Sequence, residues 1–237
     1  GTAQSTGTRL FCLSGHVRRP GVYEMPHGTT LRALLEAAGG VAEGRTLRAV
    51  LMGGAAGTFL RADEIDLPLT LEDTRAAGTT LGSGVVMAFD DTADLHDVVR
   101  RVAAFFRDES CGQCVPCRVG TVRQEEALHR IASGCTRGSV QDELVLIGEV
   151  AQGMRDASIC GLGQTASSVV ESAIRRLGLY GEAPPAHTIA PRVSEPTAVA
   201  PATDGVTFSI DGRSVTVPAG TTVLSACASL GIEVPTL

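Results

Sequence analysis

Three cysteines stand at intervals of three in the stretch DESCGQCVPCRVG, as Cys111, Cys114 and Cys117. This spacing lets consecutive thiolates converge on one side of a compact turn, which we expect in a loop between two helices. A cubane iron–sulfur cluster needs three such corners and one further ligand. Structural zinc usually takes its cysteines as two separate C-x2-C pairs, and a redox C-x-x-C needs only two. The spacing favours a 4Fe–4S site and leaves zinc or free thiols as alternatives.

Cys160 is the best candidate for the fourth ligand. It lies in DASICGLGQTA, just after one expected helix and just before another. The nearby glycines let backbone N–H groups approach cluster sulfur, and the start of a helix favours an anionic group. A 4Fe–4S core on four thiolates is anionic, so Arg118 should help to balance its charge. We predict metal ligation by Cys111, Cys114, Cys117 and Cys160, and further cofactor contacts from Gly112, Arg118, Gly161 and Gly163.

The remaining cysteines have simpler interpretations. Cys12 lies inside an expected strand and is interpreted as a small buried hydrophobic residue. Cys227 falls in the middle of an expected helix and is interpreted as structural. Cys135 stands in the polar loop SGCTRG and is expected to be an exposed thiol. None of the three has the surroundings that favour Cys160.

Other chemical motifs are weak. The stretch GLGQTA at 161–166 fits a dinucleotide fingerprint, but that fingerprint requires a hydrophobic strand immediately before it, and AQGMRDASIC is no such strand. The five histidines do not cluster. No Ser-His-Asp or paired-carboxylate constellation can be identified, so no residue is predicted to be catalytic.

Composition restricts the class of protein. Of the 237 residues, 43% are hydrophobic and 19% charged, so most of the chain should fold. The net charge of -6 and the scattered Arg-Arg pairs, which look like solvated faces, argue against a nucleic-acid partner. No apolar run is long enough to span a bilayer, and no signal peptide opens the chain. Seven cysteines without such a signal indicate a reducing compartment, so we expect a cytoplasmic protein without direct membrane insertion, peripheral to a membrane only through partner subunits.

The N-terminal part reads as a small α+β unit. LFCLSGHV and VYEM are expected strands, and LRAVLMGG and SGVVMAF are expected to follow as further strands. Between them, Thr29 or Thr30 can cap a helix that Gly39 ends in the left-handed conformation. Nothing polar converges in this unit along the sequence, so we expect it to act as a scaffold.

A helical region and a second hairpin-and-helix unit follow. Apolar periodicity predicts a helix through Leu95 to Phe106 and three more over 122–132, 142–154 and 166–177, which suggests a four-helix bundle. The stretch 182–204 carries five prolines and no glycine, as an extended linker would. Beyond it, Pro218, Gly220, Thr221, Thr222 and Gly231 repeat the spacing of Pro26, Gly28, Thr29, Thr30 and Gly39.

The segments LFCLSGHVRRPGVYEMPHGTTLRALLEAAGG, LGSGVVMAFDD and FFRDESCGQCVPCRVGT resemble the C-terminal half of the NADH-binding flavoprotein subunit of respiratory complex I. Related subunits occur in NAD-linked hydrogenases and formate dehydrogenases. The family's E-S-C-G-x-C-x-P-C-R motif falls on Glu109 to Arg118, and the fourth ligand of its C-x-L-G motif falls on Cys160. The tail from 205 to 237 resembles the opening of a plant-type 2Fe–2S ferredoxin domain, whose first cluster cysteine would follow directly after Leu237.

The resemblance implies an α+β chain with five parts. These are a flexible N-terminus (1–8), a soluble-ligand-binding β-grasp (SLBB) domain (9–91), a helical 4Fe–4S domain (92–181), a Pro-rich linker (182–204) and a truncated 2Fe–2S ferredoxin-like β-grasp start (205–237). Where the family reads C-A-L-G-D-A, this chain has Gln164, so a charge next to the ligand is lost. The family's FMN- and NADH-binding domain is not among the matched segments, and we expect a fragment.

The resulting functional prediction is electron transfer. The cluster would accept electrons from FMN, reduced by NADH in the intact protein, and pass them to a downstream iron–sulfur centre in a partner subunit or in a 2Fe–2S domain. The chain would be part of an NADH dehydrogenase-type oxidoreductase and inactive alone. The alternative is a zinc-stapled, non-redox interaction module.

Overall fold

The structure is a computed structural model that describes residues 1–181, 205–210, 212–218, 221 and 223–232. Two compact units divide the chain, one from Gly1 to His187 and the other from Thr188 to Leu237. The predicted linker at 182–204 lies outside the described residues. None of the helices in the described part of the chain is both long and apolar enough to cross a membrane.

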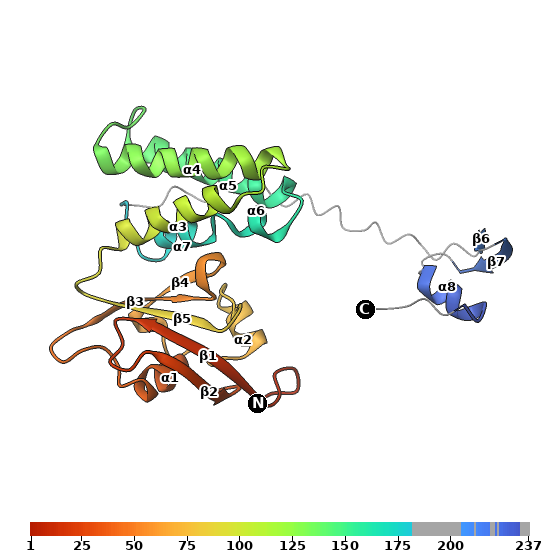
Figure 1. The fold of residues 1–237 in the computed structure, drawn as a ribbon, viewed down its shortest axis with the longest axis horizontal. Coiled ribbons are helices and arrows are strands. Elements are labelled where there is room, and N and C mark those ends of the chain that lie inside the picture. Colours follow the sequence, from red (N-terminus) through yellow and green to blue (C-terminus); the bar gives the residue numbers. More distant parts are fainter. Residues whose placement is uncertain (182–204, 211, 219–220, 222, 233–237) are drawn as a thin grey trace. The chain divides into compact units, whose positions relative to one another are not determined.

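A five-stranded mixed sheet forms the N-terminal half of the first unit (Figure 1). The strand order is β2-β1-β5-β3-β4, and β1 pairs with β5 in parallel while the other pairs are antiparallel. The expected α+β unit is therefore present, with an additional short strand at one edge. The strands are β1 (Thr8–Gly15), β2 (Gly21–Pro26), β3 (Leu47–Met52), β4 (Thr58–Arg61) and β5 (Val85–Asp90).

Short helices connect these strands. Thr30 caps α1 (Leu31–Ala37) by accepting the N–H of Ala33, and Gly39 follows the helix at φ +82°, as the sequence predicts. The other short helices are η1 (Gly54–Ala56), η2 (Ala62–Glu64) and α2 (Leu71–Ala76).

The N-terminal residues 1–8, for which the sequence predicts flexibility, make defined contacts. Ser5 is buried, and its hydroxyl donates to Glu72 at 2.6 Å and accepts from the Leu71 N–H at 2.9 Å. The chain is therefore held against the start of α2 before β1 begins.

Strand β1 shows that the interpretation of Cys12 was wrong. Phe11 and Leu13 are 0% and 3% exposed and lie in the core beneath the sheet, whereas Cys12 is exposed. Alternate residues of a strand face opposite sides of the sheet, and α1 covers only the side that Phe11 and Leu13 face. Cys12 is therefore an accessible thiol.

The cysteine-rich region is helical, with earlier helix starts than expected. The helices are α3 (Leu95–Glu109), α4 (Val115–Ser133), α5 (Val140–Ala157), α6 (Gly161–Thr165) and α7 (Ser168–Arg175). Helix α4 begins seven residues before the predicted start because Pro116 fits the first turn of a helix. Ser139 starts α5 with a capping box that uses Asp142. The fourth expected helix, 166–177, corresponds to α7, and α6 is an additional short helix before it that was not predicted.

A buried ion pair joins α4 to α5. Arg130 donates to the two carboxylate oxygens of Glu143 at 2.7 and 2.6 Å, and Glu143 is only 1% exposed. Gly120 brings the same helices close, since a Cβ there would lie 2.6 Å from the Met154 sulfur. The two helices that flank the cysteine region are thus tightly packed.

The sheet and the helices share one core. In β3, Val50 and Met52 face the α1 side, while Ala49 and Leu51 pack with residues of α3, α4, α5 and α7. The Phe59 N–H on β4 donates to the Ser172 hydroxyl of α7 at 2.9 Å. The predicted boundary near residue 91 is therefore a change of architecture within one compact unit.

The second unit repeats the opening of the first. It has the hairpin β6 (Val206–Ile210) and β7 (Arg213–Val217), followed by α8 (Val223–Ser229). Thr221 N donates to Pro218 O at 3.1 Å, as Thr29 N does to Pro26 O at 3.1 Å. Gly39 and Gly231 both have positive φ, +82° and +69°. The shared spacing thus corresponds to a shared local conformation.

Candidate iron–sulfur centre

The three closely spaced cysteines lie at one end of the helical region, where the α3–α4 connection, the start of α4 and α6 meet (Figure 1). Cys111 and Cys114 are in the connection, as predicted, but Cys117 belongs to the first turn of α4. Cys114 is the N-cap residue of α4. A spacing of three therefore places the thiols around a helix start, rather than within an irregular loop.

Local hydrogen bonds fix the path of the connection. Gly112 adopts φ +75°, a conformation that side-chain-bearing residues rarely take. The Arg118 guanidinium donates to the Gly112 carbonyl at 3.0 Å, and the Arg118 backbone N–H donates to the Cys114 carbonyl at 3.0 Å. The Ser110 hydroxyl accepts from the Gly112 N–H at 3.4 Å. Gly112 and Arg118 thus act as a pair that sets where Cys111 and Cys114 stand.

Cys160 comes to the same place from the far end of α5. It follows the α5 C-cap Ser158 and is the N-cap residue of α6. A Cβ on Gly163, three residues after Cys160, would lie 2.9 Å from Cys117 Cβ, and the pKa of the Cys117 thiol is raised by burial and, to a smaller extent, by the charges of Cys114, Cys160 and Cys111. The structure therefore brings the four predicted ligand residues together.

The two glycines after Cys160 have different surroundings. A Cβ on Gly163 would lie 2.6 Å from Ser158 Cβ and 2.9 Å from Cys117 Cβ, so Gly163 permits the close approach of the two segments. A Cβ on Gly161 would meet no atom within 4 Å. The helix that these glycines open, α6, has only five residues, so its dipole is small.

Polar hydrogens surround the thiol of Cys114. The backbone N–H groups of Ile159 and Cys117, in that order, and the Ser158 hydroxyl lower the pKa of this thiol despite partial burial. Such donors stabilise a thiolate and would equally stabilise sulfide in a bound cluster. This side of the site is therefore prepared for negative charge.

Cys117 is the most enclosed of the four residues, at 4% exposed. Burial is the largest cause that raises the pKa of its thiol, and the Ser110 hydroxyl, 3.3 Å from the sulfur, opposes that rise. Its backbone carbonyl accepts from the Thr121 hydroxyl at 2.9 Å. Cys117 is therefore held from both its side chain and its main chain.

The chemistry of the donors fits an iron–sulfur cluster. Ser158 is 7% exposed, and its hydroxyl has no hydrogen-bond partner of ordinary geometry within the described residues. A buried hydroxyl without a partner is costly, and sulfide of a cluster could accept its hydrogen. Four thiols with hydrogen-bond donors beside them, and no carboxylate or imidazole among the grouped ligand residues, are typical of 4Fe–4S ligation.

The four thiols do not form a tight single-ion site. Zinc–sulfur bonds of about 2.3 Å in a tetrahedron require sulfur atoms roughly 3.8 Å apart. Across the part of the chain that the structure describes, no group of three or more His, Cys, Asp or Glu side chains is arranged to hold a metal ion. A donor set of thiols alone is the one that a cubane cluster uses.

The other cysteines lie away from this centre. Cys117 and Ser133 are 16 residues apart on α4, about 24 Å at the usual helical rise, and Cys135 follows beyond Ser133 as an exposed thiol. Cys227 is buried, as predicted for a structural cysteine. GLGQTA follows helix α5 through a short turn and not a strand, so the context for dinucleotide binding is missing.

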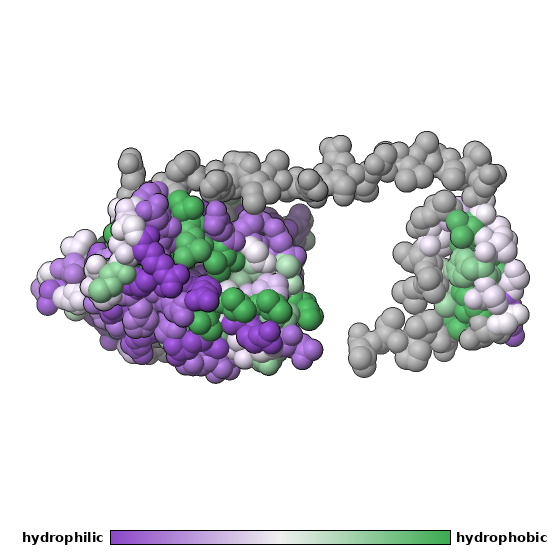
Figure 2. Space-filling view, turned by 90° about the horizontal axis from the view of Figure 1, so that it is seen from above, coloured by the Kyte–Doolittle hydropathy of each residue, from purple (hydrophilic) through white to green (hydrophobic). Residues whose placement is uncertain are grey.

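The centre is accessible and has an apolar rim. Cys111 and Cys160 are exposed, and so are the apolar side chains of Val115 (59%), Val119 (44%) and Ile159 (75%), which are close to the cysteines along the chain. Figure 2 shows hydrophobic groups gathered between hydrophilic stretches on one face of this unit. An apolar rim around an exposed centre is suited to a protein contact.

Sequence reasoning missed three residues of the site. Ser110 stands directly before Cys111 and was the easiest to find, because it belongs to the cysteine motif. Ser158 carries no sequence signal beyond the end of a helix. Gln164 was noted only for a missing charge, but its side-chain amide donates to the Ser158 carbonyl at 3.1 Å and braces the turn before Cys160.

Comparison with protein-family models identifies three regions. Residues 97–178 match the NADH-ubiquinone oxidoreductase-F iron-sulfur binding region, which contains all four cysteines of the centre. Residues 10–55 match the SLBB domain. Residues 203–237 match a 2Fe-2S iron-sulfur cluster binding domain.

Individual relatives agree with these matches. The chain is 41% identical over 175 residues to the F subunit of the NADH-quinone oxidoreductase of Mycobacterium tuberculosis, covering 74% of this chain and 39% of the relative. It is 35% identical over 166 residues to the HndC subunit of the NADP-reducing hydrogenase of Solidesulfovibrio fructosivorans, covering 70% and 33%. The sequence thus spans about two fifths or less of these relatives.

A solved structure shares the fold. The crystal structure of an NAD⁺-reducing NiFe hydrogenase in the H2-reduced state superposes with a TM-score of 0.66 at 35% identity, over 77% of this chain and 31% of the hydrogenase chain. The chain therefore carries SLBB, NADH-dehydrogenase-type 4Fe–4S and 2Fe–2S domain sequences, and it is homologous to the C-terminal region of NADH-quinone oxidoreductase F subunits and NAD-reducing hydrogenase subunits.

Proposed function

We propose that Cys111, Cys114, Cys117 and Cys160 hold a 4Fe–4S cluster that relays single electrons. The observation that carries this proposal is the arrival of Cys160, from the end of α5, beside three cysteines at the start of α4. The spacing of three cysteines by three residues, followed by a distant fourth, favours a cluster over the two separate C-x2-C pairs that are usual for structural zinc. When bound, the cluster would supply one-electron oxidation and reduction.

The surrounding residues tune and position the ligands. The N–H groups of Ile159 and Cys117 and the hydroxyls of Ser110 and Ser158 offset negative charge on sulfur. Hydrogen bonds to cluster sulfur and the local charge set the reduction potential of such centres. None of these groups has a proton-transfer or nucleophilic role in the proposal, so no residue of this chain is assigned as catalytic.

The position of the site supports a relay rather than a storage role. Two of the four cysteines are exposed, and the nearby apolar side chains of Val115, Val119 and Ile159 offer a surface for a redox partner. The homologues are subunits of NADH-quinone oxidoreductases and hydrogenases. In the proposal, NADH reduces FMN elsewhere in the intact protein, and the cluster passes electrons from FMN to a downstream centre.

The C-terminal unit is the proposed start of such a downstream centre. Its β6–β7–α8 arrangement and its match to a 2Fe–2S domain support this assignment. The described residues of this unit include a single cysteine, Cys227, which is buried as part of the packing.

The test is metal and sulfide analysis of the 237-residue chain purified without oxygen. We expect about four iron and four sulfide per chain, and an EPR signal of a cluster on chemical reduction. Cys160→Ala should abolish the intact four-iron cluster, whereas Cys135→Ala should leave iron content and EPR signal unchanged. One zinc per chain without iron would refute the relay. Loss of iron in Cys135→Ala but not in Cys160→Ala would refute the ligand assignment.

A further inference from the structure

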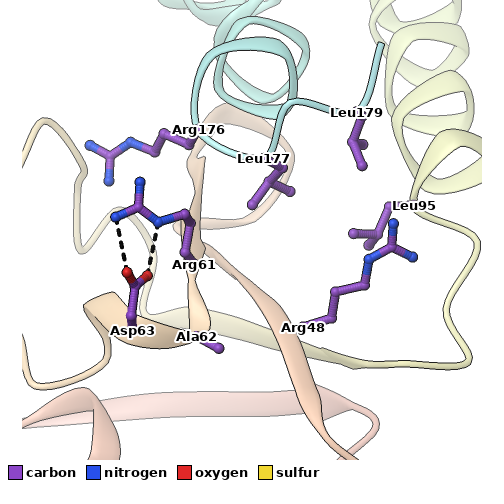
Figure 3. Close-up of a pocket in the computed structure, with 8 residues that line it drawn as sticks. All are labelled: Arg48, Arg61, Ala62, Asp63, Leu95, Arg176, Leu177 and Leu179. Carbon is purple, nitrogen blue, oxygen red and sulfur yellow. Dashed lines mark hydrogen bonds and ion pairs between the residues drawn. The ribbon is translucent and has the colours of Figure 1, made fainter. Parts of the chain in front are cut away.

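Three arginines line a pocket where the sheet meets the helical region of the first unit (Figure 3). The pocket has a volume of about 360 Å³, which is within the usual range for small-ligand sites. It is formed by β3, the β4–η2 corner, the start of α3 and the segment after α7. Its lining residues are Arg48, Arg61, Ala62, Asp63, Leu95, Arg176, Leu177 and Leu179.

The lining carries more positive than negative charge. Arg61 forms a two-pronged ion pair with Asp63 at 2.8 and 3.2 Å, and Arg176 pairs with Glu64 at 3.3 Å. Arg48 has no carboxylate partner within the described residues. In a chain of net charge -6, one guanidinium in excess at a pocket wall is a local reversal of sign.

Backbone carbonyls hold two of the arginines in place. Arg48 donates to the Ala93 carbonyl at 3.1 Å. Arg176 donates to the carbonyls of Ala77 and Gly78, and its side chain is only 22% exposed. Bonds to carbonyl groups orient a guanidinium without removing its net charge, and they leave further N–H groups free for a ligand.

The pocket also has an apolar wall. In Figure 3, Leu177 and Leu179 lie between Arg61 with Arg176 at one end of the pocket and Arg48 at the other, where Leu95 lies beside the Arg48 guanidinium. A fully hydrated inorganic ion would gain nothing from these leucines. A ligand with both an anionic group and an apolar body would use the whole lining.

We propose that this pocket binds a small organic phosphate, with the phosphate at the Arg48 guanidinium and the apolar part against the leucines. Arginine presents paired N–H donors that match phosphate oxygens. The three arginines are distant in sequence, which is why no convergence of polar groups was expected for the N-terminal unit. The site is separate from the cysteine centre and does not depend on a bound cluster.

The experiment is a calorimetric titration of the full chain with phenyl phosphate at low salt. We expect saturable binding that weakens as salt rises. Arg48→Gln should weaken it by about tenfold or more, since a charge-assisted hydrogen bond is lost while no carboxylate is left unpaired. Arg9→Gln is the matched control, because Arg9 on β1 also donates to a backbone carbonyl, that of Gly82, and should leave binding unchanged.

Two ligand arms test the chemistry of the site. Phenol should bind far more weakly than phenyl phosphate if the arginines matter, and inorganic phosphate should bind more weakly if the leucines matter. If Arg48→Gln proves unfolded by circular dichroism, Arg48→Lys replaces it, and it should also weaken binding because an ammonium lacks the paired N–H donors of a guanidinium. Absence of saturable binding to the wild-type chain, equal affinity in Arg48→Gln and Arg9→Gln, or equal binding of either simpler ligand would overturn the proposal.

Discussion

Gly161 and Gly163 are two residues apart in the same short helix, but an added methyl group should act on them in opposite ways. At Gly163 a Cβ would stand 2.6 Å from Ser158 Cβ and 2.9 Å from Cys117 Cβ, distances at which something must move. At Gly161 no atom would lie within 4 Å. Ser158 and Cys117 are 7% and 4% exposed, so neither has free space to move into. We predict that Gly163→Ala damages the centre and that Gly161→Ala does not.

The expected change in the free energy of unfolding is the balance of two opposing effects. Alanine is favoured over glycine in a helix by up to about 1 kcal/mol, and this gain applies to both positions. Overpacking a well-filled interior costs about 1–3 kcal/mol, and this loss applies only to Gly163. Gly161→Ala should thus be neutral to about 1 kcal/mol more stable than the wild type. The difference in the free energy of unfolding between the two variants should be about 1–3 kcal/mol, because the propensity gain cancels.

The assay is urea unfolding of both variants and the wild type, together with iron and sulfide content after anaerobic purification. Relief of the clash would move Ser158 and the turn before Cys160 away from Cys117, so Gly163→Ala should also contain less iron. Gly161→Ala should retain the wild-type content. Equal stability and equal iron in the two variants would show that the close approach of α6 to Cys117 does not shape the site.

Two further predictions concern other residues. Glu143 is 1% exposed, and its hydrogen bonds to Arg130 are the main reason why its pKa is lowered from 4.5 to about 2. The ionised Glu143 therefore stabilises the folded chain by up to about 3 kcal/mol. This stabilisation is complete above pH 4.5 and is lost as the pH falls towards 2. Glu143→Gln should destabilise the chain by about 3 kcal/mol at pH 7 and flatten that acid limb in urea titrations, whereas Glu149→Gln, an exposed control on the same helix, should cost under about 1 kcal/mol. Cys12 should react with a thiol reagent in the native chain and Cys227 only after unfolding, as peptide mass spectrometry would show; protection of Cys12 would contradict its outward position.

Local chemistry explains which elements could be predicted from the sequence. The cap at Thr30 and the left-handed Gly39 depend on the residues themselves, and both were found as expected. The prediction that Cys12 is buried was wrong because LFCL carries apolar groups on both faces of a strand, and only the position of α1 decides which face is buried. The predicted start of α4 was too late because the cysteines and the proline suggested a loop, although proline is compatible with the first turn of a helix.

Some features of the cysteine centre can likewise be predicted from the sequence, and others depend on the fold. Its sulfur atoms belong to a residue type with distinctive chemistry, so their spacing alone indicates a cluster. The groups that face them are backbone N–H donors and serine hydroxyls, which every sequence contains in abundance. Only the path of the chain from α5 into α6 selects Ile159 and Ser158 for that position. Candidate ligands can therefore be proposed from composition, spacing and local context, whereas the groups that face them are decided by the fold.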